Sequence, residues 1–497
     1  MIKTESGYIS GITTQDGVVS IFKGIPYASP PEGRLRWKAP EKCPSWFGVR
    51  ECTSFSSSPI QRPQAPFYMW TEEFIIDTSA GYSEDCLTLN IYCPSDVDNK
   101  DKPVVVYFHG GSFVSGGSSC EIYNGEQLAK RGVIFVTVNF REGVLGLLAC
   151  SELSQESPDK ISGNYQLLDQ IAALQWVKDN IHSFGGNPEN VTVMGQSSGA
   201  ASVCTLAVSP LAKNLFKRVF AMSHETLNMP VSVATDESGR PIMKNIYEPP
   251  AVCKYEGDKL MQGKTLEDMR AMTPDELLKL PEFLPYCIDG RVLTCSFNEG
   301  VRAGLTDGYD FILTYTATEP LFFMIMRNVT GAQEYEPAMR DFFGKHADKA
   351  MQLYPLNGNP QEFATKISVD RYIASVMMFA SLRKNSNTWV AEFDHVMPGP
   401  ESQTWGAFHT SDVPYWLGYF SDKRKDFWRS DDFALGEELV ARLEAFAKTG
   451  RPEAAAFSAW KPSDGSSLYK IDAGGFHEVQ PLEQEIYQFW RDVYCVN

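Results

Sequence analysis

The chain has 497 residues, of which 43% are hydrophobic and 22% are charged. This balance is that of a globular protein and excludes a disordered or fibrous chain. A chain of this length buries enough surface to fold without disulfide or metal staples. Its formal charge of −17 at pH 7 would repel the phosphate backbone of DNA or RNA at long range. We therefore expect no nucleic-acid partner.

The eleven cysteines are odd in number and scattered, and no two have the C-x-x-C spacing of a zinc site. We expect neither a metal nor a cofactor. Residues 1–11 lack the apolar core of a signal peptide. The longest apolar runs, such as Val133–Val138, are far shorter than the ~20 residues that span a bilayer. These features predict a cytoplasmic protein without a membrane span, although a chain from which a signal had been removed would look the same.

The first 100 residues look irregular, with Pro-rich turns at 24–31 and 59–66. A strongly α/β stretch follows. Continuous β-branched runs predict strands at Val104–Phe108, Val133–Asn139 and Val191–Met194. Apolar residues at helical spacing predict helices at Gln166–Ile181 and Ala200–Ala207, so that strands and helices alternate along the chain. This alternation is typical of a parallel sheet with helical crossovers.

Between about residues 228 and 285, charged helical segments alternate with Pro, which indicates helical insertions over the sheet. Further along the chain, the patterns predict strands at Phe311–Tyr315 and Thr388–Phe393 and amphipathic helices at Gly436–Lys448 and Leu482–Val493. No stretch has the length and polarity of a linker. We therefore expect one α/β domain over 1–497, with insertions around 228–300 and 319–385.

Residues 195–199 read Gly-Gln-Ser-Ser-Gly and fit the pattern G-x-S-x-G, with a predicted strand before and a helix after. This is the context of a nucleophile elbow, a tight turn that holds a serine above the sheet edge. Ser198 is a rival nucleophile, but only Ser197 has glycines at both −2 and +2. Alone, the pattern could also be a plain Gly/Ser turn.

A second Gly-rich turn, at 109–113, directly follows the Val104–Phe108 run and reads His-Gly-Gly-Ser-Phe. Glycines there let backbone N–H groups point into a cavity and bind an oxyanion. A phosphate loop is disfavoured, since the Lys that should follow Gly116 is missing. The two turns together are far more specific than either alone.

A nucleophilic serine needs a base to take its proton. In proteins with a nucleophile elbow, the three catalytic residues occur along the chain in the order Ser, acid, His. Four histidines follow Ser197 with a carboxylate-rich stretch in between: His346, His395, His409 and His477. Composition and spacing leave these four open.

The motifs resemble those of the type-B carboxylesterases, in the cholinesterase-like branch of the α/β-hydrolase fold. The resemblance covers nearly the whole chain, through segments at 24–28, 36–37, 83–87, 109–111, 163–165, 168–170, 184–188, 195–199, 406–409 and 446–450. It implies a large, mostly parallel central sheet flanked by helices, with helical insertions.

The resemblance implies a catalytic triad of Ser197, Glu319 and His409. It also implies an oxyanion hole built from the N–H groups of Gly111, Ser112 and Ser198. Behind this triad, Ser223 matches a serine that supports the acid, and Gln196 is the neighbour that precedes the nucleophile. Asp394 and His395 form a tempting pair that matches no catalytic position in the family.

The sequence also departs from the family pattern. Ser112 replaces a glycine, Gln196 replaces a glutamate, and Pro320 follows the acid where the family has glycine. His224 and Glu225 follow Ser223 and are expected near the site. In the family, the cysteine at the position of Cys86 pairs with a cysteine in the first loop. Pro59 stands at that loop position here, so Cys86 lacks its usual partner and is expected to be a free thiol.

Three functions follow from these residues. The first is a serine carboxylesterase that hydrolyses neutral esters of small molecules through an acyl-enzyme. The second is an amide or carbamate hydrolase, or an acyltransferase, with the same triad. The third is a non-catalytic binding protein of the same fold, which the presence of Ser197, Glu319 and His409 disfavours. The sequence leaves the substrate and the oligomeric state open.

Overall fold

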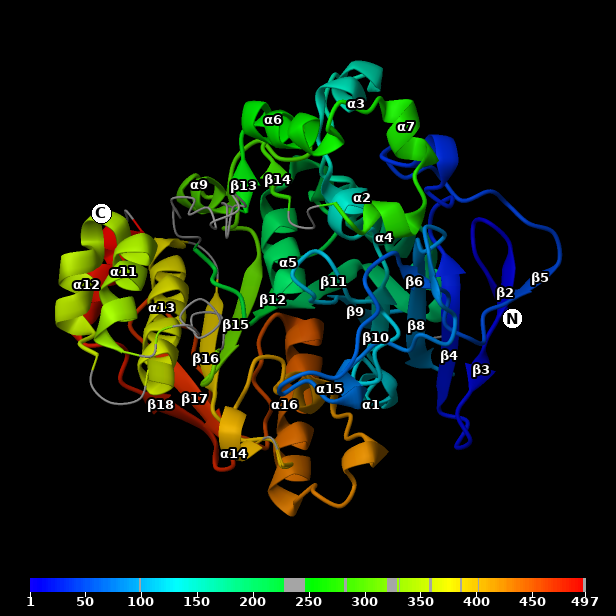
Figure 1. The fold of residues 1–497 in the computed structure, drawn as a ribbon. Coiled ribbons are helices and arrows are strands. Elements are labelled where there is room, and N and C mark those ends of the chain that lie inside the picture. The colour runs from blue at the N-terminus through cyan, green and yellow to red at the C-terminus, as the bar shows by residue number, and fades with distance from the viewer. Residues whose placement is uncertain are drawn as a thin grey trace.

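The computed structural model describes residues 1–97, 100–227, 246–280, 284–319, 329, 331–356, 360–384, 387–400 and 402–494. Its centre is an eleven-stranded sheet in the order β18-β17-β16-β15-β12-β11-β9-β10-β8-β4-β3 (Figure 1). In chain order these strands are β3 (Ile12–Thr13), β4 (Val19–Pro26), β8 (Thr88–Pro94), β9 (Lys102–Phe108), β10 (Ile134–Val138), β11 (Gly186–Gln196), β12 (Arg218–Met222), β15 (Asp310–Thr316), β16 (Thr388–Phe393), β17 (Leu468–Asp472) and β18 (Gly475–Val479).

The middle of the sheet is parallel, from β17 through β16, β15, β12, β11 and β9 to β10. Both edges are antiparallel, with β18 at one end and β8, β4 and β3 at the other. The predicted α/β-hydrolase architecture, a large and mostly parallel sheet, is therefore confirmed, and so are the strands expected from the β-branched runs.

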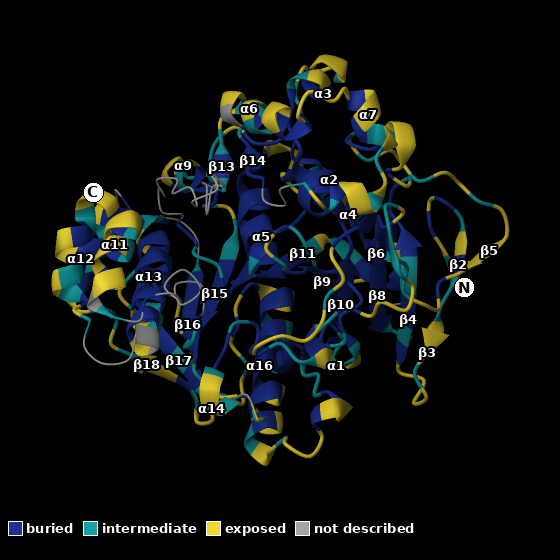
Figure 2. Cartoon of the chain, in the orientation of Figure 1, coloured by how far each residue is buried: buried dark blue, intermediate teal, exposed yellow. Residues whose placement is uncertain are grey.

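The strands of the middle are covered on both faces because successive side chains point to opposite sides. In β9, Val104, Val106 and Phe108 belong to one hydrophobic core and Val105 and Tyr107 to the other. Both cores are closed to solvent (Figure 2). This explains why the run is apolar without alternation.

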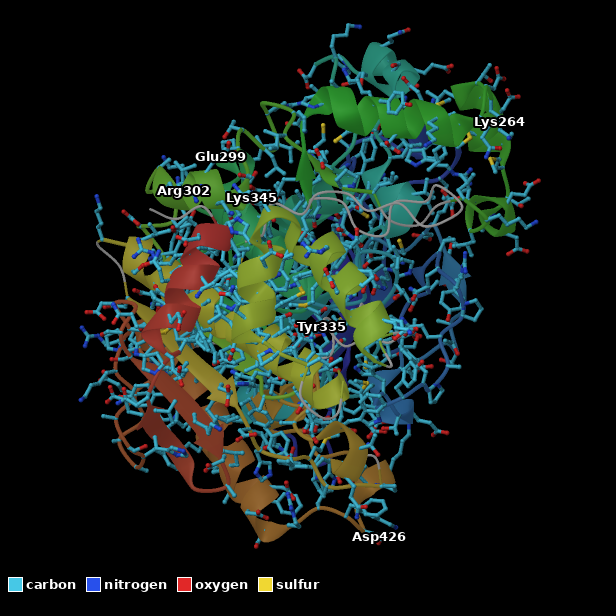
Figure 3. The ribbon with its side chains drawn as sticks, turned by 60° about the vertical axis from the view of Figure 1, so that its left-hand side comes forward. Lys264, Glu299, Arg302, Tyr335, Lys345 and Asp426 are labelled. Carbon is cyan, nitrogen blue, oxygen red and sulfur yellow. The ribbon has the colours of Figure 1, made fainter. Side chains whose placement is uncertain are left out.

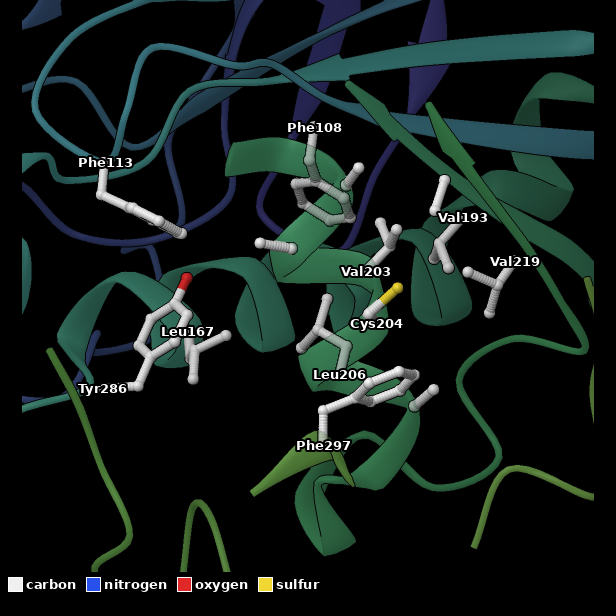
Figure 4. Close-up of a cluster of buried hydrophobic side chains, with 14 of the residues drawn as sticks. Phe108, Phe113, Leu167, Val193, Val203, Cys204, Leu206, Val219, Tyr286 and Phe297 are labelled. Atoms are coloured by element: carbon white, nitrogen blue, oxygen red, sulfur yellow. The ribbon is translucent and has the colours of Figure 1, made fainter. Parts of the chain in front are cut away.

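Helices fill both layers. Helices α4 (Tyr165–Asn180), α5 (Ser198–Val208) and α13 (Pro360–Leu382) contribute to the first core, and α16 (Ser430–Thr449) and α1 (Glu126–Lys130) to the second. Val203 and Leu206 of α5 belong to the first core together with Phe108 and Val193 of the sheet (Figure 4). The predicted helices at 166–181, 200–207 and 436–448 therefore exist with slightly different bounds.

The expectation of an irregular start to the chain is wrong. Strands β4 and β8 belong to the main sheet, and β1 (Ile2–Lys3), β2 (Tyr8–Ser10) and β5 (Val49–Glu51) form a smaller one. Strand β4 contains Gly24 and ends in Pro26, and its register with β8 shifts between Phe22 and Ile25. This irregularity breaks the period-two pattern that would have revealed the strand.

The remaining elements surround the sheet. They are β6 (Ser58–Pro59), β7 (Tyr82–Ser83), α2 (Gly143–Leu147), α3 (Ser151–Glu156), β13 (Tyr247–Glu248), α6 (Pro250–Met261), α7 (Leu266–Ala271), α8 (Pro274–Leu277), β14 (Tyr286–Cys287), α9 (Phe297–Arg302), α11 (Ala332–Phe343), α12 (Ala347–Leu353), α14 (Ser402–Trp405), α15 (Val413–Leu417) and α17 (Gln484–Val493). Charged side chains such as Lys264, Arg302 and Asp426 lie on the outside (Figure 3). Among the described residues, no helix combines the length and apolar character that a membrane span requires.

Candidate active site

Ser197 occupies the sharp turn between β11 and α5. Its backbone has φ 57° and ψ −124°, a conformation that side-chain-bearing residues rarely adopt and that only a well-braced turn sustains. Its N–H donates to the carbonyl of Met222 at 2.9 Å. A Cβ on Gly199 would lie 2.0 Å from the carbonyl oxygen of Phe108, so strand and helix approach too closely for any other residue. Residues 195–199 therefore form the tight turn that the G-x-S-x-G pattern predicted.

The two adjacent serines differ in their surroundings. Ser197 is partly exposed, whereas Ser198 is 8% exposed and forms the first residue of α5. The N–H groups of a helix's first turn have no intrahelical acceptor. The backbone of Ser198 thus offers a donor beside Ser197, while its own hydroxyl is largely shielded.

Glu319 and His409 are in direct contact. Glu319 Oε2 lies 2.6 Å from His409 Nδ1, and Glu319 Oε1 accepts from the N–H and the hydroxyl of Thr316, both at 3.0 Å. The carboxylate is fully buried. The structure therefore brings together the acid and the histidine that lie 90 residues apart in the chain.

Burial and charge oppose each other at this pair. Burial raises the pKa of Glu319, but His409, Ser223 and the Thr316 N–H together outweigh it, so the pKa of Glu319 is below the usual value. Burial lowers the pKa of His409, but the Glu319 carboxylate and, to a smaller extent, Asp412 outweigh it, so the pKa of His409 is above its usual value of 6.5. Burial and the charge of Glu319 also raise the pKa of Asp412, a further buried carboxyl, to about 7. Ser223 helps to lower the pKa of Glu319, although its hydroxyl oxygen has no partner at ordinary hydrogen-bonding distance in the described structure.

The outer nitrogen of His409 contacts Gln196. Because Nδ1 donates to Glu319, Nε2 is the acceptor of a neutral imidazole, and Gln196 Nε2 lies 3.0 Å from it. Among the described contacts, no hydrogen bond joins Ser197 Oγ to His409. In this resting arrangement the amide of Gln196 occupies the lone pair that would accept the proton of Ser197.

The Gly-rich turn after β9 lies directly against the nucleophile. A Cβ on Gly110 would come within 3.0 Å of Ser197 Cβ, and one on Gly111 would lie 1.9 Å from the carbonyl oxygen of Ser115. Ser112 has φ 58°, in the left-handed region where a glycine would be less strained. Gly111 and Ser112 line the same cavity as Ser197.

Ser197 opens into a cavity of about 610 Å³. Its wall is mostly apolar and includes Ile60, Phe67, Trp70, Phe74, Ile76, Phe113, Val144, Leu145, Leu277 and Leu278. Polar groups converge from several elements, and Gln196, His224 and His409 are among them. A largely apolar cavity with a few polar groups suits a small organic molecule.

Asp394 and His395, the tempting pair in the sequence, bind different partners in the structure. His395 Nε2 lies 2.6 Å from Asp432, while Asp394 pairs with Lys470 at 2.7 Å. His346 lies between α11 and α12, and His477 is in β18. Of the four histidines, only His409 lines the cavity of Ser197.

His224 and Glu225, which follow Ser223, lie in different surroundings. His224 lines the cavity, and burial lowers its pKa to about 3. Glu225 instead pairs with Arg371 at 2.7 Å. Pro320, the unusual neighbour of the acid, lies outside the described residues.

Sequence reasoning missed Glu142. This glutamate lines the cavity and is 3% exposed. The signal was present, because Glu142 is an acidic residue beside the apolar run 143–149, but only its buried position shows that it is unusual.

Comparison with known proteins agrees with this geometry. A family model described as "Carboxylesterase family" matches residues 1–490. The chain belongs to the carboxylesterase family. It is accordingly a carboxylic ester hydrolase with the α/β-hydrolase fold, of the type-B branch that the motifs indicated.

Individual relatives of this carboxylesterase are esterases. It is 31% identical to the para-nitrobenzyl esterase of Bacillus subtilis, over 91% of this chain and 90% of that protein. It is 30% identical to the fumonisin B1 esterase of Sphingopyxis macrogoltabida, over 92% and 83%. A solved structure titled PNB esterase superposes with a TM-score of 0.79 and 27% identity, covering 98% of this chain and 99% of that one.

Proposed function

We propose that this carboxylesterase hydrolyses neutral esters of small molecules through an acyl-enzyme on Ser197, with His409 as general base and Glu319 as the acid of the triad. The observation that carries the proposal is the 2.6 Å contact between Glu319 and His409 beside the strained turn of Ser197. Strain of this kind is found where a side chain must be held for chemistry.

In the first half-reaction, His409 Nε2 takes the proton of Ser197 as its oxygen attacks the ester carbonyl. For this step the amide of Gln196 must give up its contact with Nε2. Glu319 keeps the proton on Nδ1 and stabilises the imidazolium. The N–H groups of Gly111, Ser112 and Ser198 would hold the oxyanion.

The first half-reaction ends when His409 protonates the departing alcohol and the acyl group stays on Ser197. In the second half-reaction, His409 takes a proton from water as the water oxygen attacks the acyl-enzyme, and it returns that proton to Ser197 as the carboxylic acid leaves. Ser223 and Gln196 act on the triad from behind and beside it. This chemistry draws only on groups of the chain. We keep a cytoplasmic location and a single domain over 1–497, with insertions around 228–300 and 319–385, as parts of this proposal.

Replacing the two serines in turn tests the nucleophile. Ser197→Ala should lower kcat by about 10⁶-fold, as loss of the nucleophile does in other serine hydrolases. The matched control Ser198→Ala should keep most activity, since alanine retains the backbone N–H. A fluorophosphonate that labels Ser198 in place of Ser197, or an active Ser197→Ala variant, would contradict the assignment. Comparing an ester and an amide of one acid separates esterase from amidase activity.

A further inference from the structure

Glu142 is a buried acid in the wall of the substrate cavity. It stands at the N-terminus of α2, but its side chain makes no capping hydrogen bond. The next residue, Gly143, donates its N–H to the carbonyl of Phe113 at 2.7 Å, which ties Glu142 to the Gly-rich turn beside Ser197. A buried carboxyl without a capping role needs another explanation.

The orientation of the Gln166 side chain fixes which oxygen of Glu142 accepts a hydrogen bond. Gln166 Nε2 contacts both the carbonyl oxygen of Arg141, at 3.2 Å, and Glu142 Oε2, at 2.7 Å. A carbonyl oxygen can only accept, so the amide NH₂ must face it. Glu142 Oε2 is therefore an acceptor.

A buried chain of hydrogen bonds holds Gln166 in this orientation. Tyr286 donates its hydroxyl to Gln166 Oε1 at 3.0 Å, and Figure 4 shows this hydroxyl on the Phe113 side of the ring. Ser202 Oγ lies 3.1 Å from the same hydroxyl and accepts from Gln170 Nε2 at 3.1 Å. The donors thus run in one direction, towards the cavity, and end at Glu142 Oε2.

The other oxygen, Glu142 Oε1, has no hydrogen-bond partner among the described residues. His109 Nδ1 is 3.8 Å from Glu142 Oε1 and lies 3.0 Å from the carbonyl oxygen of Gly110, to which it donates. Burial lowers the pKa of His109 to about 4, so it carries no charge at pH 7. Burial also raises the pKa of Glu142 well above its usual value, and only the amide of Gln166 opposes this. These surroundings favour the neutral acid, and because Oε2 accepts from Gln166, Oε1 is the oxygen left to carry its proton.

We propose that Glu142 Oε1–H donates a hydrogen bond to the substrate, so that the cavity selects esters carrying an uncharged acceptor oxygen, such as a hydroxyl, ether or keto oxygen. The acid, the amide that orients it and the cavity that it lines make up this site. The proposal rests on the esterase function above and names its substrate class. A neutral donor suits an acceptor oxygen, whereas recognition of an ammonium group would require the carboxylate.

Matched ester pairs test the proposal. Each pair differs only in one oxygen, placed in the acyl part in one set and in the alcohol part in the other. For wild type, kcat/KM should favour the oxygen-bearing ester by about tenfold or more in one set, the effect of one buried hydrogen bond. Glu142→Leu should bring this kcat/KM ratio to about one, and Glu142→Gln, which keeps an N–H donor, should retain much of the preference. The control Glu392→Leu removes a buried acid outside the cavity and should leave the ratio unchanged.

Three kinetic results would overturn the proposal: no preference in wild type, a preference that survives in Glu142→Leu, or a preference for ammonium esters that Glu142→Gln abolishes. Failure of the esterase function is distinguishable, because the oxygen-free esters would then also be inert. Infrared difference spectra of wild type against Glu142→Gln at pH 7 keep the test decisive if the leucine variant does not fold. They should show a protonated carboxyl band that a hydroxyl-bearing ketone analogue shifts; a carboxylate band would refute the proposal.

Discussion

Replacing Glu319 by glutamine tests the triad most sharply, because the structure fixes how the new side chain must lie. The backbone N–H of Thr316 donates to Oε1 at 3.0 Å and needs an acceptor. The amide oxygen of glutamine would therefore occupy that place, and its NH₂ would face His409 Nδ1. That nitrogen must then accept, which moves the imidazole proton to Nε2, the nitrogen that should receive the proton of Ser197.

The expected loss has two parts. The 2.6 Å contact puts the centres of charge of carboxylate and imidazolium about 4 Å apart, where the attraction is worth about 4 kcal/mol at an effective dielectric near 20. This alone is a factor of about 10³ in rate. The wrong tautomer adds to it, so kcat should fall by about 10⁴-fold, with little change in KM.

Steady-state hydrolysis of a chromogenic ester measures this loss, with Asp394→Asn as the matched control. The side chain of Asp394 is 37% exposed and pairs with Lys470 away from the cavity, so the Asp394→Asn variant should stay within about twofold of wild type. A Glu319→Gln variant within tenfold of wild type would refute the tautomer argument. Equal losses in the two variants would refute the assignment of the acid.

Three further predictions concern other residues. Asp412→Asn should shift the acidic limb of the kcat/KM–pH profile slightly to lower pH, because ionised Asp412 raises the pKa of His409 and activity is lost as pH falls through that pKa. The shift is small because Asp412, with a pKa of about 7, is partly protonated at this limb, and an unmoved limb would contradict the prediction. Cys86, a buried free thiol in the structure, should be alkylated without reduction once the protein is unfolded, and mass spectrometry that finds it in a disulfide would argue against the cytoplasmic location. Neutral esters should be preferred to choline esters because Gln196 carries no charge, and Gln196→Glu should raise the preference for acetylcholine over its carbon isostere up to about a hundredfold; an unchanged ratio would mean that this residue does not sense the substrate.

The predictions from sequence succeeded where the cause of structure is local. The strand before the Gly-rich turn is apolar at every position because both of its faces are covered, and that shows in the residues themselves. Gly199 is fixed by the close approach of α5 to Phe108. Strand β4 escaped prediction since its bulge disturbs the period of two, although its pairing with β8 places it in the main sheet.

The site shows the same division. The sequence by itself marked Ser197 and the two Gly-rich turns, because the tight backbone that they form restricts the residue types along a short stretch of chain. It could not choose among four histidines, since partnership with an acid depends on which strand ends meet; resemblance to a family supplied Glu319 and His409, and the fold puts them in contact. Only the tertiary structure singled out Glu142, because burial raises the pKa of a carboxyl by removing water from it, and burial is a property of the packed chain.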